Sequence, residues 1–279
     1  MLRPMSKSPE TENLAVFCDF ENVALGVADA RYERFDIRKV LERLLLKGSI
    51  VVKKAYCDWG RYKEFKPLMH EAAFEMIEIP HVRQSGKNSA DIRMVVDALD
   101  LCYTKTHVDT FVIVSGDSDF SPLVSTLREN NKTVIGVGVK NSSSDLLIAN
   151  CDEFIYYDDL VRVRPPRARA PRKTTAAPAA GVAKDAKDEK DGTDKTQEAI
   201  DLVMATLEAI TQERGSEEKI WGSMVKQTLK RRSPGFNETF YGFRSFNSLL
   251  EEAATRGLME LEPDEKSGGV VIKRFKRED

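Results

Sequence analysis

Two aspartates separated by one residue follow an apolar run near the middle of the chain. The run is Thr110–Val114, and Asp117 and Asp119 lie in the turn after it. Its β-branched and aromatic residues predict a strand, and open α/β sheets bind ligands at the carboxyl ends of their strands. Asp119 alone could be only a helix cap. Together, the two side chains would offer adjacent hard oxygen ligands.

Polar side chains also end the first predicted strand. Residues 13–22 are apolar almost throughout, as expected for a strand covered on both faces, and the segment ends at Asp19, Glu21 and Asn22. We expect a long loop after this strand, followed by a helix that Asp36 caps.

Strands alternate with helices between residues 13 and 160. Further strands are predicted at residues 50–58, 75–80, 132–139 and 153–158, and helical spacing of apolar residues recurs between them. This alternation indicates right-handed βαβ units. We therefore expect an α/β fold, with a three-layer domain built on a parallel sheet over residues 13–161.

The predicted topology brings several carboxylates together. If the first and fourth strands are neighbours, Asp19 faces Asp117 and Asp119. A helix predicted from Ser89 places Asp91 in its first turn, where it could complete the cluster. Carboxylates gathered at neutral pH repel one another unless cations lie between them, and ligation by oxygen alone favours Mg²⁺ or Mn²⁺ over zinc.

Such a site suits in-line displacement at phosphorus. A divalent ion lowers the pKa of a bound water and neutralises the leaving oxygen, so no protein nucleophile is needed. Asn22 could hydrogen-bond the phosphate or a metal-bound water. Arg83 and Lys87, in a basic loop before Asp91, could hold a substrate backbone.

The remainder of the chain predicts a loose N-terminus, a linker and a second domain. Residues 1–12 are polar, and residues 162–194 mix proline, alanine and charged residues that cannot bury a core. Residues 195–279 predict three amphipathic helices, the second beginning with Ile220 and Trp221, and then a hairpin. That order is typical of a winged helix.

Composition excludes several classes of protein. The balance of 43 Lys and Arg against 45 Asp and Glu means that a nucleic acid would have to bind a local patch. Four separated cysteines and three histidines make a zinc site or a histidine-centred catalyst improbable. With no predicted membrane span or export signal, we expect a cytoplasmic protein.

Three segments resemble the NYN domain, the LabA-like branch of the PIN-like ribonucleases. They are CDFENV at residues 18–23, GKNSADIRMVVDAL at 86–99 and VSGDSDFSPLV at 114–124. The resemblance covers most of residues 13–160. It implies a metal-dependent nuclease acting on RNA, with Asp19, Asp91, Asp117 and Asp119 as the acidic residues and Asn22 as their polar partner.

The C-terminal segment resembles the OST-HTH or LOTUS domain, through PGFNE at residues 234–238 and YGFRSF at 241–246. This resemblance implies binding of RNA or of a protein partner. The third predicted helix carries few cations, which disfavours insertion into a DNA major groove. A basic cluster could instead bind phosphates without reading bases; it comprises Lys226, Lys230, Arg231 and Arg232.

The sequence thus predicts a metal-dependent endoribonuclease domain tethered to a small RNA-binding domain. A non-catalytic RNA or protein adaptor is one alternative. Another is a phosphohydrolase of the haloacid dehalogenase type, although that family expects a second aspartate where this chain has Glu21. The sequence leaves the RNA substrate, the choice of metal and the oligomeric state open.

Overall fold

The computed structural model describes residues 12–79, 89–162, 188–214, 219–264 and 269–275. The chain divides into two compact units, the first comprising Met1–Val161 and Lys230–Phe236, and the second Arg162–Leu229 and Asn237–Asp279. The predicted loose N-terminus and most of the predicted linker lie outside the described residues.

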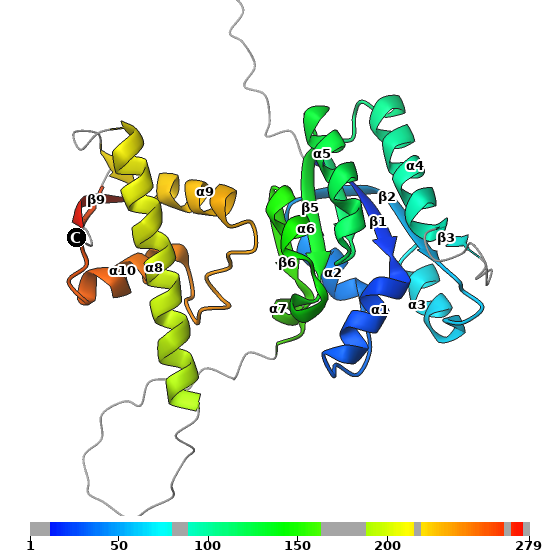
Figure 1. The fold of residues 1–279 in the computed structure, drawn as a ribbon, viewed down its shortest axis with the longest axis horizontal. Coiled ribbons are helices and arrows are strands. Elements are labelled where there is room, and N and C mark those ends of the chain that lie inside the picture. The colour runs from blue at the N-terminus through cyan, green and yellow to red at the C-terminus, as the bar shows by residue number, and fades with distance from the viewer. Residues whose placement is uncertain (1–11, 80–88, 163–187, 215–218, 265–268, 276–279) are drawn as a thin grey trace, which may run out of the picture. The chain divides into compact units, whose positions relative to one another are not determined.

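A parallel sheet forms the centre of the first unit (Figure 1). Its strand order is β3-β2-β1-β4-β5-β6, and every described pair of neighbouring strands is parallel. The strands are β1 (Glu12–Asp19), β2 (Gly48–Cys57), β3 (Glu75–Glu78), β4 (Thr110–Val114), β5 (Thr133–Gly138) and β6 (Glu153–Tyr156). The strands β1 to β3 extend the sheet in one direction and the strands β4 to β6 extend it in the other, so the order of the strands reverses between β1 and β4. The predicted α/β fold and the predicted adjacency of β1 and β4 are confirmed.

Helices cover both faces of this sheet. One face packs on α1 (Phe20–Asp29), α2 (Ile37–Leu45), α3 (Lys66–Glu71) and α7 (Tyr157–Val161), and the other on α4 (Ser89–Thr104), α5 (Ser121–Glu129) and α6 (Asp145–Asn150). Alternate side chains of β1 enter the two cores: Leu14 and Val16 lie in one, and Ala15 and Phe17 in the other. The three-layer architecture follows from this burial on both faces.

The segment after β1 differs from the prediction. The strand ends at Asp19, and α1 begins at Phe20 where a long loop was expected. The Asp19 side chain caps this helix by accepting from the Asn22 backbone N–H. Val23 and Val27, four residues apart, bury one face of α1.

Three short 3₁₀ turns complete the first unit, at Lys63–Phe65, Ser118–Phe120 and Lys140–Ser142. The second of them directly precedes α5. Asp117 caps the turn by accepting from the Asp119 N–H, and Ser118 and Ser121 lie within the turn and the helix. Pro122 occupies the first turn of α5, where proline is favoured.

The second unit combines helices with a small antiparallel sheet. Its elements are α8 (Asp188–Arg214), β7 (Ile220–Trp221), α9 (Gly222–Arg232), α10 (Phe246–Thr255), β8 (Met259–Pro263) and β9 (Val270–Phe275). The sheet order is β7-β9-β8. Ile220 and Trp221, expected on a helix, pair instead with Ile272 and Val271 of β9. The predicted sequence of three helices and a hairpin is otherwise present.

Two further observations concern the ends of these units. The helix α8 begins at Asp188, within the segment assigned to the linker from sequence. Among the described residues, no helix has both the length and the apolar character needed to cross a membrane.

Candidate active site

The carboxyl ends of β1 and β4 bring the first predicted acidic residues together. The two strands pair in parallel up to Cys18 and Val114. Asp19 is the last residue of β1, and Asp117 lies in the turn that follows β4. Their meeting at this edge follows from the strand order, because the chain changes its direction of winding here.

A buried serine joins these two chain segments. The Ser115 hydroxyl donates to Asp19 Oδ2 at 3.0 Å and accepts from the Asp117 backbone N–H at 3.2 Å. Ser115 is fully buried, and Asp19 is only 7% exposed. One hydroxyl therefore orients the Asp19 carboxylate and also fixes the backbone that carries Asp117.

Asn22 forms a second connection between the two segments. Its side-chain Oδ1 accepts from the Gly116 N–H at 2.9 Å, and its own backbone N–H donates to Asp19 Oδ1 at 3.4 Å. Since Asn22 lies in the first turn of α1, the capping of this helix also positions the amide. The predicted functional residue thus holds the turn after β4.

The acidic residues interact through their charges. Burial, followed by the charge of Asp91, raises the pKa of Asp19 to about 7. Burial, followed by the charges of Asp117 and Asp119, raises the pKa of Asp91 to about 6. Asp19 and Asp91 therefore bind protons more tightly than free carboxylates do, and the charges of Asp117 and Asp119 contribute to this effect.

The chemistry of these donors fits a hard divalent cation. They offer oxygen atoms, and a bound cation would relieve the repulsion that raises both pKa values. The ligands are not assembled in advance, however. Among the described residues, no three or more His, Cys, Asp or Glu side chains are grouped closely enough to hold a metal ion. Binding an ion would require the carboxylates to draw closer.

Other predicted residues lie elsewhere. Arg83 and Lys87 fall outside the described residues. The predicted basic cluster lies on α9, where Lys226 pairs with Glu238 at 2.7 Å and Arg231 is exposed in the last turn. Lys230, Arg231 and Arg232 lie in the last turn of α9, where cations interact favourably with the helix dipole, so these three residues have a structural role besides any binding.

Sequence reasoning gave too little weight to Ser115 and Gly116. Ser115 links the two segments that carry Asp19 and Asp117, and no motif in the sequence singles it out. A Cβ on Gly116 would lie 2.5 Å from the Ser142 carbonyl oxygen, so the turn can pack against residues 142–144 only with glycine here. The only feature of the sequence that could have identified Ser115 and Gly116 is their position directly after β4, where the strand order reverses.

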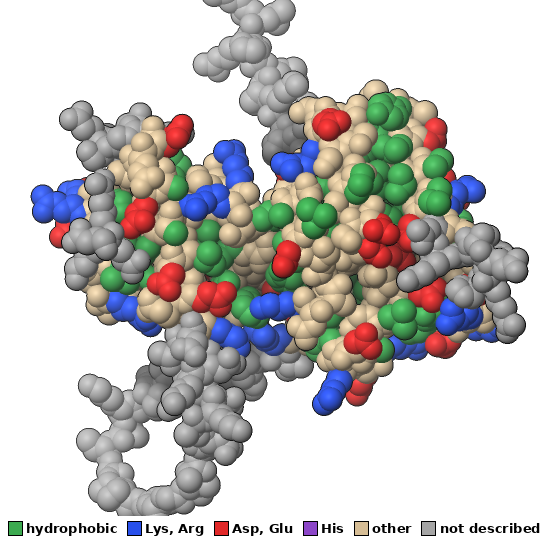
Figure 2. Space-filling model, viewed as in Figure 1, with side chains coloured by type: hydrophobic (Ala, Val, Ile, Leu, Met, Phe, Trp, Pro, Cys, Tyr) green, Lys and Arg blue, Asp and Glu red, His purple; other side chains and the backbone are tan. Residues whose placement is uncertain are grey.

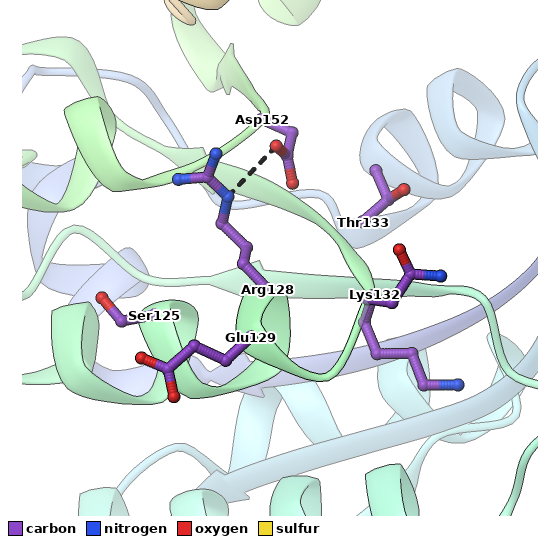
Figure 3. Close-up of a pocket in the computed structure, with 7 residues that line it drawn as sticks. Ser125, Arg128, Glu129, Lys132, Thr133 and Asp152 are labelled. Atoms are coloured by element: carbon purple, nitrogen blue, oxygen red, sulfur yellow. Dashed lines mark ion pairs between the residues drawn. The ribbon is translucent and has the colours of Figure 1, made fainter.

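A pocket of about 560 Å³ lies away from the acidic residues (Figure 3). It lies where α5 ends and β5 begins, and is therefore at the amino edge of the parallel sheet. Three charged side chains of the pocket already make contacts within the domain. Arg128 pairs with Asp152 at 3.2 Å, and Lys132 donates to the Val108 carbonyl at 2.7 Å. The acidic edge of the sheet remains the better candidate for a functional site.

Comparison with known proteins identifies the first unit. Residues 13–158 match the profile of the NYN domain, and because they make up more than half of the 279 residues, the chain belongs to the NYN domain family. The predicted resemblance is thus confirmed for this unit. The family is of the PIN-like ribonuclease type, which indicates a nuclease-related function connected with RNA.

Curated relatives share this domain. The chain is 27% identical over 154 residues to the meiosis regulator and mRNA stability factor 1 of Xenopus tropicalis. It is 26% and 25% identical over 154 residues to the proteins of that name from Bos taurus and Mus musculus. Each alignment covers 55% of this chain but only 9% of the relative.

A solved structure is also similar to this part of the chain. It is the crystal structure of a protein of unknown function from Vibrio parahaemolyticus, with 28% sequence identity and a TM-score of 0.49. The alignment covers 56% of this chain and 98% of that protein.

Proposed function

We propose that the first unit is a metal-dependent endoribonuclease whose acidic residues are Asp19, Asp91, Asp117 and Asp119. The observation that carries this proposal is the buried link from Asp19 through Ser115 to Asp117, which ties the carboxyl ends of β1 and β4 into one acidic site. Relatives named as mRNA stability factors support RNA as the substrate.

In this proposal the four aspartates hold Mg²⁺ or Mn²⁺. When bound there, such an ion would lower the pKa of a coordinated water and would neutralise charge on the scissile phosphate. Ser115 keeps the Asp19 carboxylate oriented, and its burial excludes water from that side of the site. Asn22 holds the turn that carries Asp117 in place through the Gly116 N–H.

A phosphohydrolase of the haloacid dehalogenase type fits the site less well. Both carboxylate oxygens of Asp19 already accept hydrogen bonds, which suits an oriented ligand better than an attacking nucleophile. Glu21, at the position where that family expects an aspartate, pairs with Arg61 at 3.1 Å. Trapping a phosphorylated Asp19 would nevertheless favour that chemistry over ours.

A non-catalytic RNA or protein adaptor is the second candidate. The lack of a closely grouped ligand set among the described acidic, cysteine and histidine residues favours it.

We further propose that the second unit is a LOTUS-like RNA-binding module, supported by the exposed Arg231 of α9. Tethering would raise the local concentration of RNA at the first unit. A protein partner of the second unit is the alternative.

The test compares the wild-type chain with Asp117→Asn on a mixed RNA pool, with and without added Mn²⁺. The amide keeps the shape of the side chain and can still accept from the Asp119 N–H, but it removes a ligand charge. We expect cleavage to be lost and RNA binding to be retained. A wild-type chain that binds RNA but never cleaves it under these conditions would establish the adaptor instead.

A further inference from the structure

The outer surface of α4 carries apolar side chains that its own domain leaves uncovered. Ile92, Val96 and Tyr103 are 63%, 55% and 62% exposed, and the partly buried Leu99 lies between Val96 and Tyr103. We call these four residues the α4 stripe. Figure 2 shows hydrophobic side chains gathered over this helix. A contiguous exposed apolar surface of this kind indicates an interaction site.

The spacing of the α4 stripe fits a second helix. Successive members are four, three and four residues apart, which is the a and d pattern of a heptad. The stripe therefore runs along one side of α4 for roughly 16 Å. Apolar residues at these positions pack between those of a facing helix.

We propose that the α4 stripe binds the same stripe of a second copy of this chain, as an antiparallel helix pair with two-fold symmetry. The midpoint of the stripe lies between Val96 and Leu99, so the symmetry axis would pass there. Val96 of each copy then packs against Leu99 of the other, and Ile92 against Tyr103. Because each copy uses the same surface, the contact forms a dimer and leaves no free stripe to bind a third copy.

Charge complementarity selects the second copy. Arg93 and Asp100 are both exposed and flank the stripe on the same side, seven residues apart. In an antiparallel pair these flanks meet, which places each Arg93 opposite the second copy's Asp100. In a parallel pair the same flank would face Val95 and the buried Cys102, which offer no charge. The surface is therefore complementary to itself in one orientation.

The existing contacts of these two residues permit the intermolecular pair. Arg93 Nε lies 3.0 Å from Asp97 Oδ1, but the Arg93 side chain remains 57% exposed and retains further N–H donors. Asp97 itself accepts from the Tyr56 hydroxyl at 2.9 Å, so its role is structural. Asp91 lies at the start of α4, so the antiparallel arrangement leaves the two acidic sites at opposite ends of the helix pair.

The dimer is tested by sedimentation velocity of the full chain across the micromolar range, since a small interface gives weak association. Val96→Lys places a charge beside the symmetry axis, and we expect it to raise the dimer dissociation constant at least about 100-fold. Leu25→Lys is the matched control, because Leu25 is 52% exposed on α1, outside the stripe, and should leave association unchanged.

Charge reversal tests the orientation. Arg93→Asp and Asp100→Arg should each weaken self-association, because each places like charges opposite one another. A mixture of the two variants should form mixed dimers, which native mass spectrometry distinguishes by mass. Circular dichroism of each variant confirms that it is folded.

Three results would overturn the proposal. The first is a wild-type chain that stays monomeric throughout the concentration range. The second is a dimer that Val96→Lys leaves intact, which would lie on another surface. The third is a monomer whose RNA affinity falls with Val96→Lys, which would assign the stripe to RNA.

Discussion

The substitution Asp19→Asn removes the most deeply buried charge of the acidic site. The pKa of Asp19 is raised from 3.8 to about 7, first by burial and next by the charge of Asp91. Since one pKa unit corresponds to about 1.4 kcal/mol, ionising this carboxyl costs the folded chain about 4 kcal/mol more than the unfolded chain. Asparagine cannot accept hydrogen bonds on both terminal atoms, which offsets about 1 kcal/mol. In the absence of metal, we therefore expect the unfolding free energy of Asp19→Asn to exceed that of the wild type by about 2–3 kcal/mol at about pH 8.

This gain depends on pH in a defined direction. The folded chain keeps the Asp19 proton between pH 3.8 and about 7, whereas the unfolded chain releases it. The stabilising contribution of Asp19 is therefore complete below that window, decreases through it and is lost above about pH 7. Wild type and Asp19→Asn should have similar stabilities at about pH 4 and diverge as the pH rises.

Urea unfolding in the presence of a chelator, followed by circular dichroism at both pH values, measures the difference. Asp29→Asn is the control, because it removes an exposed carboxylate from the end of α1 and should change stability by less than about 0.5 kcal/mol. Added Mn²⁺ should remove most or all of this difference. At a free ion concentration about 100 times the dissociation constant, the wild-type chain gains about 2.7 kcal/mol, and the variant gains much less.

Two outcomes would refute this account of Asp19. One is an equal stability difference at both pH values, which would mean that its ionisation costs nothing in the folded chain. The other is a metal-free variant that is less stable than the wild type at about pH 8, which would mean that the hydrogen bonds of Asp19 outweigh its desolvation.

Three further predictions concern the neighbouring contacts and the second unit. Ser115→Ala removes the donor to Asp19 Oδ2 and should weaken Mn²⁺ binding about tenfold in calorimetric titration; unchanged affinity would contradict a positioning role. Gly116→Ala should lower the unfolding free energy by about 2 kcal/mol in urea, because its Cβ would lie 2.5 Å from the Ser142 carbonyl oxygen, and full stability would count against that packing. Arg231→Ala should reduce the slope of log affinity for RNA against log salt by about 1, whereas an unchanged slope would mean that this side chain contacts no phosphate.

The sheet of the first unit was predictable because strands that are buried on both faces consist almost entirely of apolar residues. Strands such as β4 read as uninterrupted apolar runs, and their alternation with helices restricts the topology to very few choices. The proximity of Asp19 and Asp117 followed from that topology alone. No knowledge of individual side-chain contacts was needed for it.

Local signals failed where tertiary contacts decide the structure. Gly26 weakens the helical pattern after β1, yet α1 forms because this glycine is buried against Ser142, more than a hundred residues away. The two residues of β7 are too few to show a period, and only their pairing with β9 makes them a strand. The hydrogen bonds that Ser115 makes with Asp19 and Asp117 depend on the side-chain rotamer of Ser115, which the spacing of residues in the sequence does not reveal.

Gly116 is held from both sides, since Asn22 accepts from its N–H and its carbonyl accepts from the Ser144 N–H. Two segments distant in sequence thus immobilise the backbone of this one residue on both sides. Anyone wishing to retarget this protein to another substrate should leave residues 142–144 unaltered, because a longer or bulkier segment there would displace Asp117.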